Sequence, residues 1–381
     1  MNLRSLKTIT TYLTASAAVF LISCGSGGDG TILSEDSVTV APADTASSAK
    51  IPDLKPKGAK PEWGPSITDN MLVVIEKLAS YNAPPIESLS AVEARKQPTP
   101  TKAVMDVMAE NNIPMPPSMV DTTGQDIQVK GGNIHARIYT PRVSKDKYPV
   151  VVYYHGGGWV IADLDVYDAS AKGLAEQTGA VVVSVHYRQG PENKFPTAHN
   201  DAFAAYEWVL KNASSFKGDT AKIAVAGESA GGNLACNVSI MARDKKIKVP
   251  LHQVLVYPVA NNDTNAESYN KYAAAKPLNK PMMAWFVKNY LPSPATAADK
   301  RISLVGANLK GLPSTTIIAA EIDPLMSDGK ALEDALKKAD VKVDYKLYNG
   351  VTHEFYGMAT VLPEAKEAQG VAADAIKNSF E

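Results

Sequence analysis

This sequence has few cysteines and almost no excess of charge of either sign. Its 381 residues include only two cysteines, Cys24 and Cys236, which excludes a disulfide framework. Lys plus Arg number 39 and Asp plus Glu number 40, so no global field favours nucleic acid or an acidic polymer as a partner. No repeat period is visible, which excludes solenoids and propellers. Ligands at zinc spacing are also missing, and we expect neither a metal nor an organic cofactor.

The first residues have the pattern of an export signal. Arg4 and Lys7 precede an apolar stretch, residues 11–22, that is too short and too rich in Thr, Ser and Ala for a stable transmembrane helix. The segment Leu21-Ile22-Ser23-Cys24 resembles the bacterial lipobox, whose cysteine receives a diacylglyceryl group before cleavage. Residues 1–23 are therefore predicted to be a lipoprotein signal peptide, with Cys24 as the first mature residue. The alternative is an ordinary cleaved signal peptide with an incidental cysteine.

The composition after Cys24 predicts a flexible tether. Residues 24–52 begin with a Gly-rich segment and continue in Ser, Thr, Ala and Pro, which cannot bury a core. We therefore expect an exported protein that is lipid-anchored to the cell envelope and touches the membrane only through this anchor. Asp is absent directly after Cys24. By resemblance to Gram-negative sorting rules, this favours the outer membrane, facing the periplasm or the cell surface.

From Gly124 onward, predicted strands alternate with predicted helices. Apolar, β-branched runs such as Val150-Val151-Val152-Tyr153 are typical of strands buried on both faces of a parallel sheet. The predicted strands are Asp126–Lys130, His135–Thr140, Val150–Tyr154, Val181–Tyr187, Ile223–Ala226, Gln253–Tyr257, Thr316–Ala320 and Lys342–Tyr348. The first two strands are expected to form an antiparallel hairpin, and the others to belong to crossover units. The sequence thus predicts an α/β fold with a mostly parallel eight-stranded sheet flanked by helices, including Asp201–Lys211, Leu234–Arg243 and Lys330–Ala339.

Two segments interrupt this alternation. Residues 67–112 and residues 261–294 both place apolar side chains at helical spacing, for example Met71, Val74 and Ile75 in the first. We interpret them as two halves of a helical cap over the site. The alternative is surface helices with no role there. The predicted domains are N-terminal cap helices over residues 53–123 and a catalytic domain over residues 124–381, with a cap insertion near 261–294.

A Gly-x-Ser-x-Gly pentapeptide surrounds Ser229. Gly227-Glu228-Ser229-Ala230-Gly231 follows the predicted strand Ile223–Ala226 and precedes a helical run that starts at Gly232. Its glycines allow a sharp turn that exposes the serine above the sheet, and the helix start directs N–H groups toward developing negative charge. This context predicts that Ser229 is a nucleophile.

Chain order selects the base for Ser229. A serine hydroxyl needs a neighbouring group to take its proton, and after such an elbow the acid and then the histidine follow along the chain. Only His353, just past the last predicted strand, satisfies this order. The histidines that come too early are His135, His155, His186, His199 and His252.

Three carboxylates follow the seventh predicted strand and compete for the role of the acid. Asp323 is favoured because Pro324 forces a loop directly after it, and a carboxylate at such a turn can face the site. It would accept the Nδ1 proton of the histidine and fix the tautomer of the ring. Asp328 is interpreted as a helix N-cap, and Glu321 as a buried or cap-facing residue.

A second motif can supply the donors that a tetrahedral intermediate needs. His155-Gly156-Gly157-Gly158-Trp159 follows the predicted strand that ends at Tyr154, and the N–H of Ala230 is the other expected donor. A glycine run could be a simple tight turn. The presence of two motifs at the ends of two separate strands favours an oxyanion hole.

Four ordered motifs together resemble the hormone-sensitive-lipase-like branch of the α/β hydrolases, the bacterial family IV esterases. The resemblance covers roughly Lys60 to the C-terminus. Its motifs are the glycine run at 155–159, Tyr187–Glu192 with Phe195-Pro196 and Asp201-Ala202, Gly227–Ala235, and Asp323-Pro324-Leu325 with His353. It implies an α/β-hydrolase fold with a helical cap, and it implies that Gly157, Gly158 and Ala230 supply the oxyanion hole.

This sequence departs from the family pattern at three places. Glu228 replaces the usual Asp before the serine, Gln189-Gly190 replaces Leu-Ala, and Glu354 replaces the common Gly after the histidine. None of these changes removes a triad group. If Glu228 and Glu354 lie near the pocket, we expect their charge to disfavour anionic substrates.

Together these residues predict a carboxylic-ester hydrolase that works through an acyl-enzyme on Ser229. The resemblance, and a small pocket expected under the cap, favour short- to medium-chain acyl esters as the small-molecule substrate. One alternative is amide or lactam hydrolysis by the same triad, and another is a degraded hydrolase that acts as a small-molecule receptor. The sequence leaves the oligomeric state open, a homodimer included.

Overall fold

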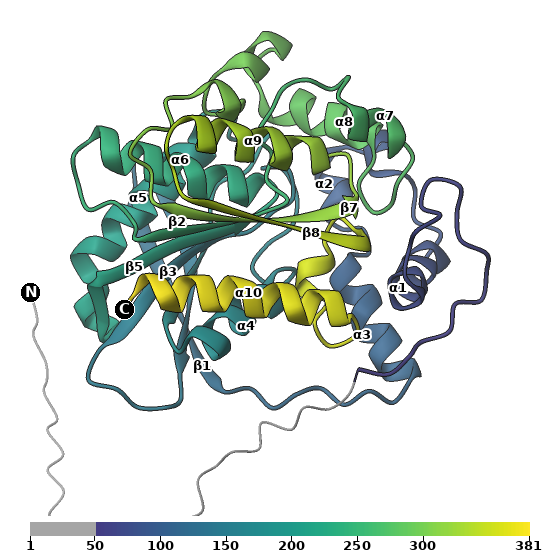
Figure 1. Ribbon diagram of the computed structural model, residues 1–381, viewed down its shortest axis with the longest axis horizontal. Coiled ribbons are helices and arrows are strands. Elements are labelled where there is room, and N and C mark those ends of the chain that lie inside the picture. The colour runs from purple at the N-terminus through teal and green to yellow at the C-terminus, as the bar shows by residue number, and fades with distance from the viewer. Residues whose placement is uncertain (1–50) are drawn as a thin grey trace, which may run out of the picture. The chain divides into compact units, whose positions relative to one another are not determined.

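The computed structural model describes residues 51–381, and the strands in this range form one sheet (Figure 1). The predicted signal peptide, Cys24 and almost all of the predicted tether lie outside the described residues. The sheet order is β1-β2-β4-β3-β5-β6-β7-β8. The strands are β1 (Val120–Val129), β2 (Gly132–Pro141), β3 (Tyr148–Tyr154), β4 (Val181–His186), β5 (Gly218–Glu228), β6 (His252–Val256), β7 (Ser314–Ile322) and β8 (Val343–Thr352). The β1–β2 and β2–β4 pairs are antiparallel and the other pairs parallel, which confirms the predicted mostly parallel eight-stranded sheet.

The first strand is longer than predicted. The sequence indicated a start at Asp126, whereas β1 begins at Val120 and pairs with β2 along its whole length. Its early residues are polar and mostly exposed, because β1 lies at the edge of the sheet, and so the apolar pattern that marks a buried strand is missing there. The last residues assigned to the cap segment 53–123 therefore belong to the sheet.

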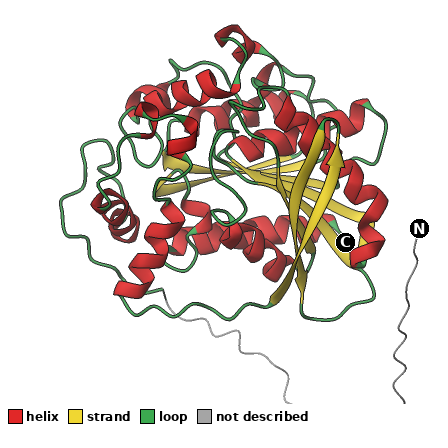
Figure 2. Cartoon of the chain, turned by 180° about the vertical axis from the view of Figure 1, so that it is seen from behind, coloured by secondary structure: helices red, strands yellow, loops and turns green. Residues whose placement is uncertain are grey.

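Helices cover both faces of the sheet, as Figures 1 and 2 show. On one face α4 (Asp168–Thr178) packs against α10 (Pro363–Ser379). On the other, α5 (Thr197–Asn212) packs against α6 (Ala230–Asp244), and α9 (Met326–Lys338) packs against β7 and β8. Successive residues of β3, such as Val151 and Val152, belong to two separate apolar clusters. Both faces of the central strands are thus buried, which explains their unbroken apolar sequences.

The two segments outside the alternation fold as short helices and loops toward the same end of the sheet (Figure 1). The N-terminal segment holds α1 (Asp69–Ser80), η1 (Ile86–Ser88), α2 (Ala91–Ala94) and α3 (Pro100–Glu110). The insertion holds α7 (Glu267–Lys271) and α8 (Lys280–Tyr290), followed by η3 (Pro294–Ala298) and η4 (Leu304–Gly306). The short helices η2 (Ala213–Phe216) and η5 (Phe355–Gly357) lie elsewhere in the chain. The segments meet where the Trp285 indole of α8 donates to the Leu89 carbonyl at 2.9 Å.

Candidate active site

Ser229 occupies the turn between β5 and α6 in a strained backbone conformation. Its φ is +56° and its ψ is −119°, values that a residue with a side chain adopts only when its surroundings impose them. The flanking glycines make the turn possible. A Cβ on Gly227 would lie 2.2 Å from the Gly231 carbonyl oxygen, and one on Gly231 would lie 2.0 Å from that of Tyr154. The Ser229 amide donates to the Val256 carbonyl at 2.8 Å, which fixes the turn to the end of β6.

The structure brings Ser229, His353 and Asp323 together from the ends of three strands. His353 Nε2 lies 3.0 Å from Ser229 Oγ, and His353 Nδ1 lies 2.6 Å from Asp323 Oδ2. Asp323 follows β7 and His353 follows β8, so all three residues lie at the carboxyl edge of the sheet. The other Asp323 oxygen accepts from the Leu325 amide at 2.8 Å. In this arrangement the imidazole can take a proton from the hydroxyl while the carboxylate holds its other nitrogen.

Carboxylates around His353 favour its charged form. Burial alone lowers the pKa of His353, but Asp323, with smaller effects from Glu354 and Glu228, outweighs burial, and the pKa is raised above its usual value of 6.5. The ring of Tyr257 packs against the imidazole, with 4.4 Å between ring centroids. The site therefore stabilises the imidazolium that forms when His353 accepts a proton.

Glu228 does not line the cavity next to Ser229, contrary to the position considered for its charge. Its side chain is fully buried, and its carboxylate accepts hydrogen bonds from the hydroxyls of Tyr153 and Tyr257. Burial raises the pKa of Glu228 to about 7. Of the two glutamates that depart from the family pattern, only Glu354 lines the main cavity.

The other two carboxylates after β7 have structural partners. The prediction that Asp328 caps a helix was wrong, because α9 begins at Met326 and Asp328 lies in its first turn. Its buried carboxylate instead accepts from the amides of Ala260 and Asn261, both at 2.9 Å, where the insertion begins. Glu321 is half-buried and bonds to the Ser66 hydroxyl and the Gly350 amide.

The three predicted oxyanion donors lie around Ser229. Gly157 and Gly158 line the same cavity as the serine, with φ of +91° and +57°, and Ala230 is the first residue of α6. Within residues 51–381, the amides of Gly157 and Gly158 donate to no protein acceptor. A Cβ on Gly157 would lie 2.1 Å from the Ile161 carbonyl oxygen, and one on Gly158 would lie 2.2 Å from the Phe286 ring. Glycine is therefore required at both positions.

Two side chains that the sequence did not identify hold this glycine loop in place. Arg95, from the N-terminal segment, donates to the carbonyls of Val160 and Gly190 at 2.8 and 2.6 Å, and it also pairs with Glu192. Gln189 donates to the carbonyls of residues 161 and 162, both at 2.8 Å. No local motif marks Arg95, because its partners lie 65 or more residues away. Gln189 was visible only as a departure from the family pattern.

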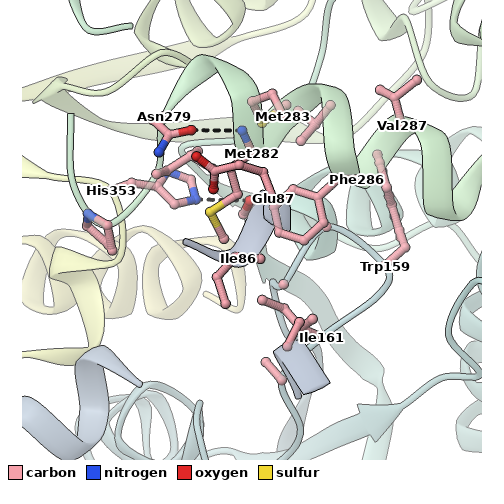
Figure 3. Close-up of a pocket in the computed structure, with 18 of the residues that line it drawn as sticks. Ile86, Glu87, Trp159, Ile161, Asn279, Met282, Met283, Phe286, Val287 and His353 are labelled. Atoms are coloured by element: carbon pink, nitrogen blue, oxygen red, sulfur yellow. Dashed lines mark hydrogen bonds between the residues drawn. The ribbon is translucent and has the colours of Figure 1, made fainter. Parts of the chain in front are cut away.

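Ser229 and His353 line a cavity of about 1060 Å³, and Figure 3 shows His353 among the side chains around it. Ile86 and Glu87 of the N-terminal segment line it, and so do Met282 and Phe286 of α8. The prediction of a small pocket was therefore wrong. The two extra segments form walls of the space above the serine without filling it. Residues of both segments line the cavity, and their apolar side chains suit an uncharged organic ligand.

Two further classes of site are not found among the described residues. No group of three or more His, Cys, Asp or Glu side chains in residues 51–381 could hold a metal ion. In the same range, no helix is both long and apolar enough to cross a bilayer.

Comparisons with known proteins point to one family. Residues 151–357 match a family model described as the α/β hydrolase fold. The chain is 38% identical over 252 residues to carboxylesterase NlhH of Mycobacterium tuberculosis, which covers 65% of this chain and 79% of that protein. It is 31% identical over 297 residues to ethyl acetate hydrolase of Pseudomonas putida, covering 77% and 92% of the two chains.

Solved structures agree with these sequence matches. An esterase of Pyrobaculum calidifontis is 38% identical and superposes with a TM-score of 0.71, covering 77% of this chain and 94% of its own. A thermostable esterase from Pseudomonas putida ECU1011 is 30% identical with a TM-score of 0.76, covering 83% and 98%. The likeness therefore extends beyond the elbow motif to most of the described chain.

Proposed function

This chain belongs to the α/β-hydrolase family, whose esterase members it resembles over most of its length, and we propose that it hydrolyses carboxylic esters with Ser229, His353 and Asp323 as its catalytic triad. The observation that carries the proposal is the hydrogen-bonded series from Ser229 Oγ through His353 to Asp323, at 3.0 and 2.6 Å. Ser229 and His353 line a largely apolar cavity together with Gly157 and Gly158, whose amides donate to no acceptor among residues 51–381.

The reaction follows from this geometry. Ser229 Oγ attacks the ester carbonyl carbon while His353 Nε2 takes the hydroxyl proton, and Asp323 stabilises the imidazolium. The amides of Gly157, Gly158 and Ala230 stabilise the oxyanion of the tetrahedral intermediate. His353 then gives the proton to the departing alcohol. Water attacks the acyl-enzyme in the same manner and releases the carboxylic acid.

The cavity sets the class of ester. Its volume of about 1060 Å³ exceeds what a two-carbon acyl group and a small alcohol occupy, and side chains such as Met282 and Phe286 make its wall apolar. We propose short- to medium-chain acyl esters whose alcohol part is itself apolar and sizeable. A ligand of this kind buries apolar area on both sides of the scissile bond, which favours binding.

Nitrophenyl esters of increasing acyl chain length test this function, with wild type and Ser229→Ala assayed side by side. We expect turnover by the wild type, with a preference for short to medium chains, and no turnover above background by the variant. Activity that survives in Ser229→Ala would contradict the assignment of the nucleophile. Comparing one ester with its amide isostere separates the proposed function from amide hydrolysis.

For the N-terminal residues, we propose export and lipid anchoring at Cys24, so that the catalytic domain is tethered to the cell envelope. The support is the segment Leu21-Ile22-Ser23-Cys24 and the Gly/Ser-rich composition that follows it. Metabolic labelling with a clickable fatty acid should mark the wild type but not Cys24→Ala. Equal label in both chains would refute lipidation at Cys24.

A further inference from the structure

Glu354, the residue after His353, directs a carboxylate at the base of the triad. Its Oε1 lies 3.9 Å from His353 Nε2 and accepts a hydrogen bond from the Tyr167 hydroxyl at 2.6 Å. Its φ is +72°, a backbone conformation that glycine adopts without steric cost but that is strained for glutamate. The chain thus keeps a glutamate beside His353 at a position whose backbone suits glycine better.

The distance between the two groups fits a bridging water. A separation of 3.9 Å is too long for a direct hydrogen bond, but a single water can lie within bonding distance of both atoms. In the resting enzyme Nε2 bonds to Ser229 Oγ. In the acyl-enzyme this oxygen carries the acyl group, so Nε2 is available to a water. Such a water would lie next to both the base and the acyl carbon.

Glu354 also lines a second, smaller cavity. Its volume is about 70 Å³, and it is lined by Glu354, Tyr167 and Glu228 together with methionines such as Met105 and Met115. These two methionines are half exposed, so the cavity lies close to the protein surface. It has room for about two waters at roughly 30 Å³ each. Glu354 and Tyr167 line both cavities. A water in the second cavity would therefore lie beside Glu354 without occupying the main cavity.

We propose that Glu354 positions the water that hydrolyses the acyl-enzyme, an inference that rests on the proposed function. The water oxygen forms a bond to the acyl carbon, one of its protons passes to His353 Nε2, and its other hydrogen is donated to Glu354 Oε1. The tetrahedral intermediate then collapses. The bond from carbon to Ser229 Oγ breaks, Nε2 returns the proton to Oγ, and the carboxylic acid leaves through the cavity.

Kinetics with nitrophenyl acetate separate this role from a general one. The value of kcat/KM reports on steps up to acylation, whereas kcat reports on deacylation where that step is slower. For Glu354→Gly, which relieves backbone strain, we expect kcat and KM to fall together by about tenfold with kcat/KM unchanged. Glu354→Gln keeps an acceptor oxygen and should recover most of kcat. Glu367→Gln replaces an exposed glutamate of α10 and serves as the control, with no change in either constant.

Intact-mass analysis of samples quenched during turnover provides the second readout. The acylated fraction of Ser229 should rise in Glu354→Gly relative to wild type. An equal fall of kcat and kcat/KM without added acyl-enzyme, or no change in either constant, would overturn the role of Glu354. Failure of the proposed function has a different signature, since no acyl group would then appear on Ser229 even in the wild type.

Discussion

Replacing Gly157 by alanine tests the oxyanion hole directly. The new Cβ would lie 2.1 Å from the Ile161 carbonyl oxygen, about 1 Å inside an ordinary contact distance, at a φ of +91°. That carbonyl cannot easily retreat, because Gln189 donates a hydrogen bond to it at 2.8 Å. The loop must therefore shift by about 1 Å and misdirect the Gly157 amide. Loss of one such donor costs about 100- to 1000-fold in kcat.

Steady-state kinetics on a nitrophenyl ester, together with a thermal melt, measure this effect. Gly306→Ala is the matched control, since a Cβ there meets nothing within 4 Å, and it should retain both activity and melting temperature. For Gly157→Ala we expect a fall of about 100-fold or more in kcat, while fluorophosphonate still labels Ser229 slowly. A Gly157→Ala protein with kcat within about threefold of wild type would refute the assignment of this amide.

Three further predictions concern the base and the supports of the site. His353 must be neutral to accept a proton, and its pKa is raised above 6.5. The acidic limb of the pH profile of kcat/KM should therefore have its midpoint above pH 6.5. A midpoint below pH 6.5 would contradict the account. Arg95→Met leaves two loop carbonyls without their donor, so we expect urea unfolding to show a free energy of unfolding lowered by about 1–3 kcal/mol. Arg142→Met removes only an exposed ion pair and should lower it by less than about 0.5 kcal/mol. Equal losses in the two variants would contradict the structural role of Arg95. Asp328→Ala removes the acceptor of two backbone amides near the insertion and should lower the free energy of unfolding by about 2–4 kcal/mol. Asp334 is exposed on the same helix, and Asp334→Ala should leave the free energy of unfolding nearly unchanged. A larger loss in Asp334→Ala than in Asp328→Ala would be inconsistent with the structure.

The sequence predicted the parts of the molecule that depend on chain order. Apolar strands such as Val150–Tyr154 can be buried on both faces only in a sheet with helices on each side. Once Ser229 is placed at the elbow, the catalytic acid and then the histidine must follow it along the chain. His353 was reached by elimination among six histidines. Order and local pattern therefore sufficed for the fold and for the residues that the structure brings together.

Contacts between distant segments were beyond such reasoning. Arg95 reaches the glycine loop from the N-terminal segment, and Tyr167 bonds to Glu354 across 187 residues. From the sequence alone, Glu228 was considered as a charge near the substrate. In the structure, its carboxylate accepts hydrogen bonds from Tyr153 of β3 and from Tyr257, which follows β6. The partners of a buried charge depend on strand register, which the sequence pattern does not specify.

Labelling with a fluorophosphonate tests the central claim most directly, because this probe reacts only with a serine that a neighbouring base activates. After digestion and peptide mass analysis, we predict a single adduct on Ser229 in the wild type, its absence from Ser229→Ala, and strongly slowed labelling in His353→Ala. An unlabelled Ser229 in folded wild-type protein, or equal labelling rates with and without His353, would contradict the account.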